Sequence, residues 1–176
     1  MIEMLKVLRL GHRRERDKRI STHVALTARA LGADEFILTG EKDDKLMKTV
    51  KDVVKRFGGS FKINYSDNWE KTVKENRKKS HKIIHLTMYG EKIQDIKREI
   101  KEIKNCLIIV GGEKVPKKAY ELSDYNVSVT NQPHSEVSAL AILLDRYYEG
   151  KELGFKFEDG EIEIKPSKSE KIVEKK

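Results

Sequence analysis

The sequence has few of the residues that mark secreted or metal-binding proteins. Its 176 residues include one cysteine, three prolines and one tryptophan. A single cysteine excludes an intramolecular disulfide, and the position of Cys106 at the start of the apolar run "CLIIV" is typical of a small core residue. The five histidines are scattered without cysteine partners, so we expect no metal site.

Long apolar runs are also missing. None approaches the roughly 20 residues that a membrane-spanning helix needs, and no signal peptide is recognisable. We therefore expect a soluble, cytoplasmic protein with no membrane partner. The length predicts one main domain that buries roughly two thirds of its unfolded surface.

Charge, by contrast, is abundant. The formal net charge is +8 and 38% of the residues are charged. A basic balance favours an anionic partner such as RNA. The joint abundance of lysine and glutamate fits a heat-adapted surface equally well. Composition leaves both interpretations open, so the location of the basic residues has to decide.

Strand-like apolar runs alternate with helical patterns along most of the chain. The expected strands are 2–10, 34–40, 60–66, 82–90, 106–112 and 125–129. The expected helices are 21–33, 43–59, 68–79, 91–105, a short one in 116–124, and one that ends near residue 146. This alternation predicts an α/β fold with a mostly parallel sheet and helices on both faces.

The C-terminal end breaks the alternation. The stretch "FKFEDGEIEIK" (155–165) alternates around Asp159–Gly160, which predicts an appended β-hairpin. The predicted organisation is therefore a main domain at 1–150, a hairpin extension at 151–166 and a charged, frayed tail at 167–176.

Four strand ends are candidates for a functional site, because open parallel α/β sheets bind ligands at the carboxyl ends of their strands. They are 9–19, 85–90, 110–116 and 129–136. The glycine pair in the third would let a ligand approach the backbone closely, but it is neither a dinucleotide fingerprint nor a Walker loop. The adjacent pair His134–Ser135 lacks a third member, so a hydrolase triad is not favoured.

The turn at 129–136 joins a strand to a helix that is apolar nearly all round. Such a helix must be covered on more than one side. The polar turn before it is therefore expected to face whatever lies above the sheet.

Five arginines lie between residues 9 and 19, beside His12 and Asp17. We expect this segment to be a loop at a strand end, where arginine suits planar recognition of phosphate. The candidate RNA contacts are Arg13, Arg14, Arg16 and Lys18, with Lys117, Lys118 and Arg146 as further phosphate contacts.

Three segments, 7–34, 85–90 and 108–146, together resemble the archaeal tRNA (cytidine(56)-2'-O)-methyltransferases of the SPOUT class. The resemblance implies a deep trefoil knot near the C-terminus, a homodimer, S-adenosylmethionine as cofactor and tRNA as partner, with no DNA. It also implies that the apolar helix after the polar turn packs on the sheet and on the partner subunit.

The resemblance further implies a cofactor site built from three pieces. They are Leu86, the run Gly111, Gly112, Glu113, Lys114 and Val115, and the run Val129, Thr130, Asn131, Gln132, Pro133, His134, Ser135 and Glu136. The implied reaction is 2'-O-methylation of the ribose of a T-loop cytidine.

The broader ribose-methylating SPOUT pattern fits less well at two places. Its catalytic arginine would fall on Leu26, and Val137 replaces the asparagine of its last motif, although Ser135 matches. Our hypothesis is that an arginine of the 9–19 segment does this work, Arg19 ahead of Arg9. His12 is the conventional candidate for the base, and a structural role for it is equally open.

Three rival interpretations remain on the sequence. One is a basic α/β module that binds RNA without chemistry, which leaves the glycine pair and the polar turn unexplained. Another is a SPOUT relative that methylates a different RNA site or base. The third, a nucleotide-dependent oxidoreductase or phosphate-binding enzyme, lacks the glycine fingerprint.

Overall fold

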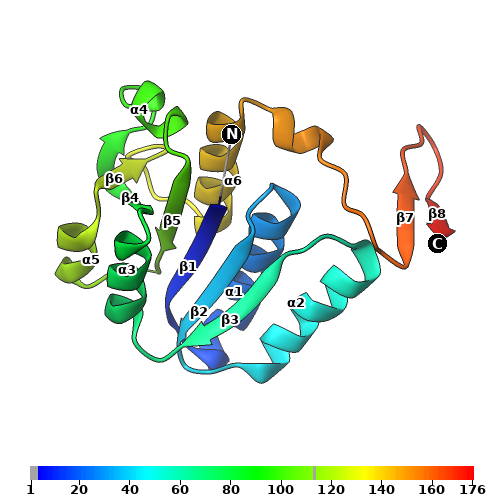
Figure 1. Ribbon diagram of the computed structural model, residues 1–176, viewed down its shortest axis with the longest axis horizontal. Coiled ribbons are helices and arrows are strands. Elements are labelled where there is room, and N and C mark those ends of the chain that lie inside the picture. Colours follow the sequence, from blue (N-terminus) through cyan, green and yellow to red (C-terminus); the bar gives the residue numbers. More distant parts are fainter. Residues whose placement is uncertain (1–3, 113) are drawn as a thin grey trace.

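Six parallel strands form one sheet with helices on both of its faces (Figure 1). The computed structural model describes residues 4–112 and 114–176. The sheet order is β3-β2-β1-β5-β4-β6. The strands are β1 (Met4–His12), β2 (Glu35–Gly40), β3 (Lys62–Ser66), β4 (Lys82–Lys92), β5 (Asn105–Val110) and β6 (Tyr125–Ser128). The predicted α/β class is confirmed.

The helices divide between the two faces according to the apolar stripes that they bury. They are α1 (Arg14–Ala30), α2 (Asp44–Phe57), α3 (Trp69–Lys78), α4 (Lys97–Lys101), α5 (Lys117–Leu122), α6 (Glu136–Tyr148) and the 3-10 helix η1 (Lys151–Gly154). Helices α1, α2 and α6 contribute to one hydrophobic cluster, and α3 and α5 contribute to the other.

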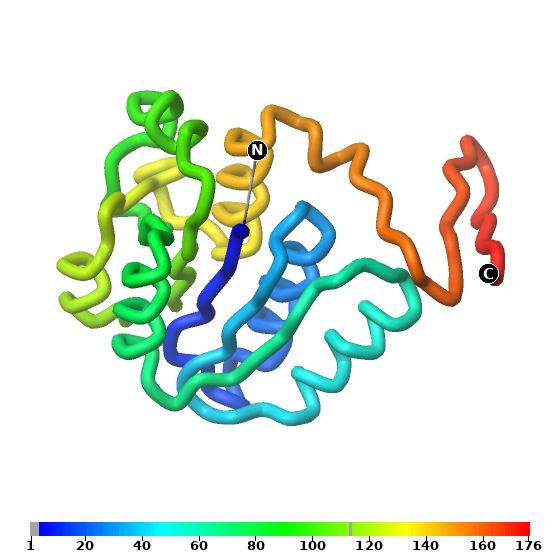
Figure 2. The backbone as a smooth tube through the Cα atoms, in the orientation of Figure 1, coloured from blue at the N-terminus to red at the C-terminus, as the bar shows by residue number. Residues whose placement is uncertain are grey.

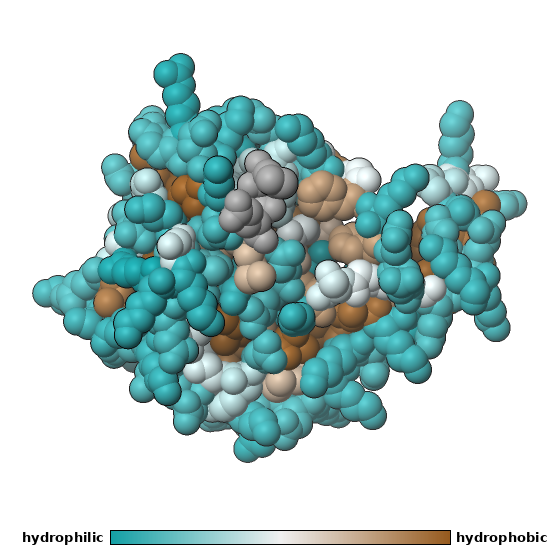
Figure 3. All heavy atoms as spheres, in the orientation of Figure 1, coloured by the Kyte–Doolittle hydropathy of each residue, from teal (hydrophilic) through white to brown (hydrophobic). Residues whose placement is uncertain are grey.

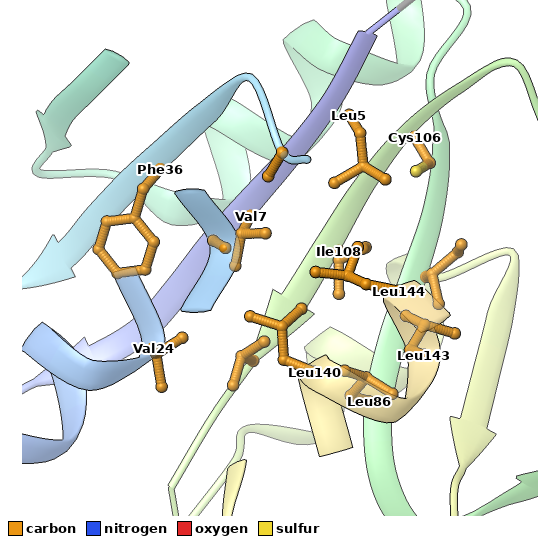
Figure 4. Close-up of a cluster of buried hydrophobic side chains, with 14 of the residues drawn as sticks. Leu5, Val7, Val24, Phe36, Leu86, Cys106, Ile108, Leu140, Leu143 and Leu144 are labelled. Carbon is orange, nitrogen blue, oxygen red and sulfur yellow. The ribbon is translucent and has the colours of Figure 1, made fainter. Parts of the chain in front are cut away.

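Strand β1 shows how one sequence serves both faces. Successive side chains of a strand point to opposite sides. Leu5 and Val7 pack in the cluster under α1 and α6, whereas Leu8 and Leu10 pack under α3 and α5. Figure 4 shows the first cluster, where Leu140, Leu143 and Leu144 of α6 lie against the strands. Arg9 has the same parity as Leu5 and Val7, which directs it to the face of α1 and α6.

Helix α1 begins seven residues earlier than the sequence predicted, so the arginine-rich segment is mostly helical rather than a loop. Local hydrogen bonds explain the early start. The carboxylate of Asp17 accepts from the backbone N–H of Arg13 at 3.0 Å and from its guanidinium at 2.9 Å. Asp17 and Glu15 also place negative charge in the first turn, where the helix dipole favours it.

The helix predicted at 91–105 is wrong over most of its length. Strand β4 continues through Lys92, because Glu91 and Lys92 pair with Val127 and Ser128 of β6. Only the five residues of α4 are helical. Ile93, Ile100 and Ile103 are nevertheless buried. The helical spacing of these isoleucines therefore predicted which side chains are buried, but not the conformation of the backbone.

An antiparallel hairpin is present, but not between the residues that were predicted to form it. Strand β7 (Ile162–Lys165) pairs with β8 (Ile172–Lys175), which comes from the expected tail. Residues 155–160 form no strand and instead run from the end of α6 across to α2 (Figure 2). We call this segment the C-terminal strap.

The strap is fastened to the first half of the sheet. The backbone N–H of Gly59 donates to the carbonyl of Glu158 at 2.7 Å. The guanidinium of Arg29 lies 4.8 Å from the centre of the Phe157 ring. The positive φ of Gly59, 88°, is one that only glycine adopts readily, and it lets this loop meet the strap.

The surface matches the composition. Hydrophilic side chains cover most of the face seen in Figure 3. Among the described residues, no helix is long and apolar enough to span a membrane.

Candidate active site

Four strand ends lie next to one another at the carboxyl edge of the sheet. Strands β1, β5, β4 and β6 are neighbours in that order and all run in the same direction. The sheet therefore brings together the four segments that the sequence singled out. Their polar groups approach a common region above β1, β5 and β4.

Arg9 is the most deeply buried charged group of this region. It sits in β1 with 1% of its surface exposed. Its Nε donates to the Ser21 hydroxyl at 3.1 Å, and its Nη1 donates to the Leu10 carbonyl at 3.4 Å. Its Nη2 lies 3.6 Å from a carboxylate oxygen of Glu136, the first residue of α6. Arg9 thus links the end of β1 to the start of the apolar helix.

The electrostatics of Arg9 follow from this burial. Burial lowers the pKa of Arg9, while the negative charges of Glu136 and Asp17 oppose that change. A buried guanidinium stays charged in proteins, so it is a fixed positive charge in a region of weak screening. Such a charge interacts strongly with any anion that enters the region.

His12 lies behind Arg9, also 1% exposed, with both ring nitrogens occupied. Nδ1 is 2.8 Å from the Ser21 hydroxyl and Nε2 is 3.1 Å from a carboxylate oxygen of Asp43. Asp43 caps α2 through its other oxygen, which accepts from the backbone N–H of Leu46 at 3.0 Å. Burial raises the pKa of Asp43, but the hydrogen bonds from Leu46 and His12 outweigh it and the net shift is downward.

The remaining basic residues of the segment are exposed on the first turns of α1. They are Arg13, Arg14, Arg16, Lys18 and Arg19. Arg13 pairs with Asp17, and the Arg14 Nε lies 3.7 Å from a carboxylate oxygen of Glu41. The structure therefore separates the arginines that the sequence grouped. Arg19, the preferred catalytic candidate from the sequence, lies on the surface, whereas Arg9 is inside.

The glycine pair follows β5 and reaches the same place. A side chain on Gly112 would lie 3.7 Å from both Arg9 Nη2 and Glu136 Oε1. A side chain on Gly111 would collide with Val115 at 2.5 Å. Lys114 is exposed, and Glu113, also predicted for this site, lies outside the described residues.

The turn after β6 is organised by Asn131. Its amide nitrogen is 2.7 Å from the carbonyl of Met88, 3.3 Å from that of Gly90 and 3.1 Å from the Ser128 hydroxyl. This amide ties the turn to the end of β4. Leu86, 8% exposed, pairs with Val110 and Val127 and lies under the two loops.

The rest of the turn is open to solvent. Val129 is half-buried, and Thr130, Gln132, Pro133, His134 and Ser135 are exposed. The His134 Nδ1 lies 2.6 Å from the Gln132 carbonyl, and the Ser135 hydroxyl accepts from the backbone N–H of Val137 at 3.2 Å. Ser135 is therefore the cap of α6, whereas the His134 ring is turned to the Gln132 carbonyl.

The further phosphate candidates are split between the two edges of the sheet. Lys117 and Lys118 begin α5, directly after the glycine pair, and both are exposed. Arg146 is in the last turn of α6, which runs back toward the amino edge. Arg146 is thus remote from the basic residues of α1 and α5, and it lies near Lys97 instead. Among the described residues, no group of three histidine, cysteine, aspartate or glutamate side chains is arranged to hold a metal ion.

Sequence reasoning missed two members of this region, Ser21 and Asp43. Ser21 was read only as a helix start, and Asp43 only as part of the helix pattern at 43–59. Asp43 does carry a local signal, because aspartate is a preferred N-cap. Nothing local indicates that it meets His12, which lies 31 residues away.

The comparisons with known proteins identify the family of this chain. A family model described as "tRNA ribose 2'-O-methyltransferase, aTrm56" matches residues 57–174. The tRNA (cytidine(56)-2'-O)-methyltransferase of Methanocaldococcus jannaschii is 58% identical over 173 residues, which is 97% of this chain and 96% of that protein. The chain belongs to the tRNA ribose 2'-O-methyltransferase family. The resemblance carried by the three sequence segments is confirmed.

A second member of this tRNA ribose 2'-O-methyltransferase family covers the same span. The tRNA (cytidine(56)-2'-O)-methyltransferase of Methanopyrus kandleri is 50% identical over 169 residues, 96% of this chain and 95% of that protein. The family model begins at residue 57, so Arg9, His12, Ser21 and Asp43 precede the part that it matches. The full-length relatives extend over nearly the whole chain.

Solved structures show how widely the fold of this family member is shared. The SpoU methyltransferase AviRb from Streptomyces viridochromogenes, solved in complex with its cofactor AdoMet, superimposes with a TM-score of 0.59 at 16% identity. The match covers 84% of this chain and 57% of that one. The chain therefore has the fold of the SPOUT methyltransferases.

Proposed function

We propose that the protein methylates the ribose 2'-oxygen of cytidine 56 in the T-loop of tRNA, with S-adenosylmethionine as methyl donor. Family membership at 50–58% identity over almost the full length is the observation that carries this proposal. The buried Arg9 at the meeting point of the glycine pair and the polar turn supports it independently.

The residues at the carboxyl edge suit this cofactor. When bound, it supplies a methyl group on a sulfonium, which is already activated. Gly112 is exposed and has no side chain, so an incoming group can meet the backbone. The open turn at 130–135 adds backbone donors and acceptors on the other side. We propose that Leu86, residues 111–115 and residues 129–136 hold the cofactor.

Arg9 is our choice for the arginine that assists the reaction, in place of Arg19. Its guanidinium is fixed by Ser21 and lies within reach of the loops that hold the cofactor, whereas Arg19 is exposed on α1. We propose that Arg9 donates a hydrogen bond to the ribose oxygen and stabilises negative charge on it as the proton leaves to water. Fixed donors of this kind need no reorganisation during the reaction. Alignment of the ribose supplies the rest.

The proposed RNA surface is the exposed part of the same edge. The first turns of α1 carry four exposed cations, Arg14, Arg16, Lys18 and Arg19. The exposed Lys117 and Lys118 of α5 add two further positive charges. We propose that these groups contact tRNA phosphates, which position the nucleic acid without reading its sequence. The partner is RNA and not DNA, and the setting is the cytoplasm.

A homodimer built around α6 and a trefoil knot complete the proposal. Ile142 lies on the largely apolar helix α6 and is 41% exposed. An exposed apolar side chain at this position supports a partner subunit on that face of α6. A side chain on Gly90 would lie 2.5 Å from the backbone of Asn126 and Val127, so the end of β4 and β6 pass in immediate contact. The knot itself is proposed from family membership.

The test is incubation with S-adenosylmethionine labelled in its methyl group and unmodified tRNA, followed by mapping of the labelled nucleotide. We expect one 2'-O-methylated cytidine at position 56. Label at another nucleotide would assign a different RNA substrate to the same fold. Cofactor binding without transfer to any RNA would refute the substrate class, and failure to bind the cofactor would leave only an RNA-binding module.

A further inference from the structure

A continuous chain of hydrogen-bonded side chains runs away from Arg9 into the protein. Arg9 Nε is 3.1 Å from the Ser21 hydroxyl, which is 2.8 Å from His12 Nδ1, and His12 Nε2 is 3.1 Å from Asp43. The four residues come from β1, α1 and the N-cap of α2, and each is at most 4% exposed. A solvent-free polar chain of this length is uncommon in a core.

The chemistry of the groups fixes the two outer hydrogen bonds, and the neutral form of the His12 ring then fixes the middle one. Arg9 Nε can only donate, so Ser21 accepts from it. The Asp43 carboxylate can only accept, so the proton between it and His12 is on Nε2. In the neutral ring Nδ1 is then an acceptor, and the Ser21 hydroxyl donates its proton to it. Each bond therefore points from the cation at the site to the anion behind it.

The chain also determines which part of Arg9 faces the site. With Nε held by Ser21, the Nη2 group points toward Glu136 and toward the space next to Gly112. A free arginine side chain has many rotamers, and burial with one fixed donor removes most of them. The guanidinium is thus held in a single orientation before any substrate arrives.

We infer that Ser21, His12 and Asp43 are positioning residues, which hold and polarise Arg9 for the methyl transfer without touching the substrate. The negative charge of Asp43 holds the His12 ring in the tautomer with its proton on Nε2. Nδ1 of His12 then accepts the Ser21 proton, and this orients the Ser21 oxygen toward Arg9 Nε. This inference rests on the proposed role of Arg9. It also gives a role to His12, whose two ring nitrogens already have partners inside the protein.

Asp43→Asn is the sharpest test, because it changes no heavy-atom shape. The asparagine oxygen can still cap α2 at Leu46, and its NH2 then faces His12 Nε2. Two donors would oppose each other, so His12 must move its proton to Nδ1. The His12–Ser21 hydrogen bond then reverses, and the Ser21 oxygen has to accept from both His12 and Arg9. We expect a fall in kcat of about tenfold, as for other residues that orient a functional group, with KM for both substrates unchanged. Nitrogen-15 NMR of the histidine rings should show the switch from the Nε2–H to the Nδ1–H tautomer.

Two substitutions at His12 distinguish its hydrogen bond to Ser21 from its hydrogen bond to Asp43. His12→Asn keeps a polar group near Ser21 and loses Asp43, whereas His12→Gln keeps Asp43 and loses Ser21. Because Ser21 holds Arg9 directly, we expect His12→Gln to lower kcat more than His12→Asn. His81→Gln, at another buried histidine on the opposite edge of the sheet, is the control and should leave kcat unchanged. Equal losses in all three variants would overturn the inference in favour of general destabilisation.

Coupling to Arg9 distinguishes this inference from the proposed function. If Ser21 acts through Arg9, Ser21→Ala should lower kcat about tenfold in the wild type and hardly at all in an Arg9→Lys background. Loss of activity in Arg9→Lys with full activity in Ser21→Ala and Asp43→Asn would overturn only the positioning chain. Full activity in Arg9→Lys would overturn the role of Arg9, and absence of methyl transfer by the wild type would overturn the proposed function itself.

Discussion

Buried polar groups occur at both edges of the sheet, and the two edges treat them differently. At the carboxyl edge, Arg9, Ser21, His12 and Asp43 are linked in a directed chain. At the amino edge, where α3 ends and β4 begins, Asn76 Oδ1 and both ring nitrogens of His81 make no hydrogen bond of good geometry. Only the backbone carbonyls of Asn76 and Lys79 approach the His81 ring.

The two edges differ in whether their buried polar side chains are linked to one another. At the amino edge the polar groups make separate local contacts: Asn76 Nδ2 donates to the Thr72 carbonyl, and the Asp124 carboxylate accepts from the backbone N–H of Ile83. The carboxyl edge satisfies each group in a fixed direction. Stability alone does not require such ordering, because apolar residues of similar volume often replace buried ion pairs without loss of stability.

Replacement of Arg9 is expected to have the largest effect of any change at the carboxyl edge. Arg9→Lys keeps the charge but loses the planar fork that reaches Ser21 and the site together. We expect kcat to fall by about 10²–10³, the usual cost of one donor to a developing oxyanion. Single-turnover methylation at saturating tRNA measures it. Arg14→Lys is the matched control, and an equal loss there would mean that Arg9 has no special place.

Gly90 tests whether the carboxyl edge depends on close backbone packing. An alanine side chain would lie 2.5 Å from backbone atoms of Asn126 and Val127, which cannot rotate away. We expect Gly90→Ala to lower the free energy of unfolding by roughly 1–3 kcal/mol and to weaken cofactor binding. Urea titration and calorimetry measure the two effects. Gly154→Ala meets no atom within 4 Å and should change neither.

The exposed cations of α1 test the outer part of the same edge. Replacing Arg14, Arg16 and Arg19 together with glutamine should weaken tRNA binding at low salt. The slope of log affinity against log salt should become shallower by about two, because fewer counterions are released. The control removes three exposed lysines at the amino edge, Lys78, Lys79 and Lys82. If both triple variants bind alike, the RNA surface is not confined to one edge.

The smallest expected effect concerns the pH dependence of stability at the amino edge. Burial, with a contribution from the charge of Lys6, lowers the pKa of His81, and burial also lowers the pKa of His85. Well above 6.5, the ordinary pKa of histidine, both side chains are neutral in the folded and unfolded chains. Below it the unfolded chain binds protons that the folded protein resists, so stability falls until the pH passes the lowered values.

His81→Gln removes one of these titrating groups. The curve of unfolding free energy between pH 7 and pH 5 should therefore be flatter than in the wild type, as thermal melts across that range would show. His23→Gln, at an exposed position of α1, should leave the slope as it is. A slope unchanged in both variants would show that the amino edge does not resist protonation at His81.

Much of the architecture was predictable, because in most segments the spacing of apolar residues matches the secondary structure that forms. The alternation of strands and helices indicated the parallel sheet, and the strand-end rule selected the four segments that do meet. The failures arose where tertiary contacts override local pattern. The isoleucine spacing after Gly90 predicted a helix, but pairing with β6 and the amide of Asn131 keep residues 91–92 in a strand.

The site was only partly predictable for the same reason. Arg9 was among the candidates, yet sequence alone could not separate it from Arg19, because burial depends on strand parity and on where α1 starts. Ser21 and Asp43 join the site through contacts across 9 and 31 residues. No spacing rule reports such contacts.

The C-terminal strap has a consequence for how the protein is made. Phe155 packs on Tyr148 of α6, and Gly59, between α2 and β3, is bonded to Glu158. The earliest β–α units are therefore closed by residues that are synthesised much later. On the ribosome, the nascent chain stays without this contact until the strap has left the exit tunnel. Synthesis of the strap thus determines when the first β–α units are held in place.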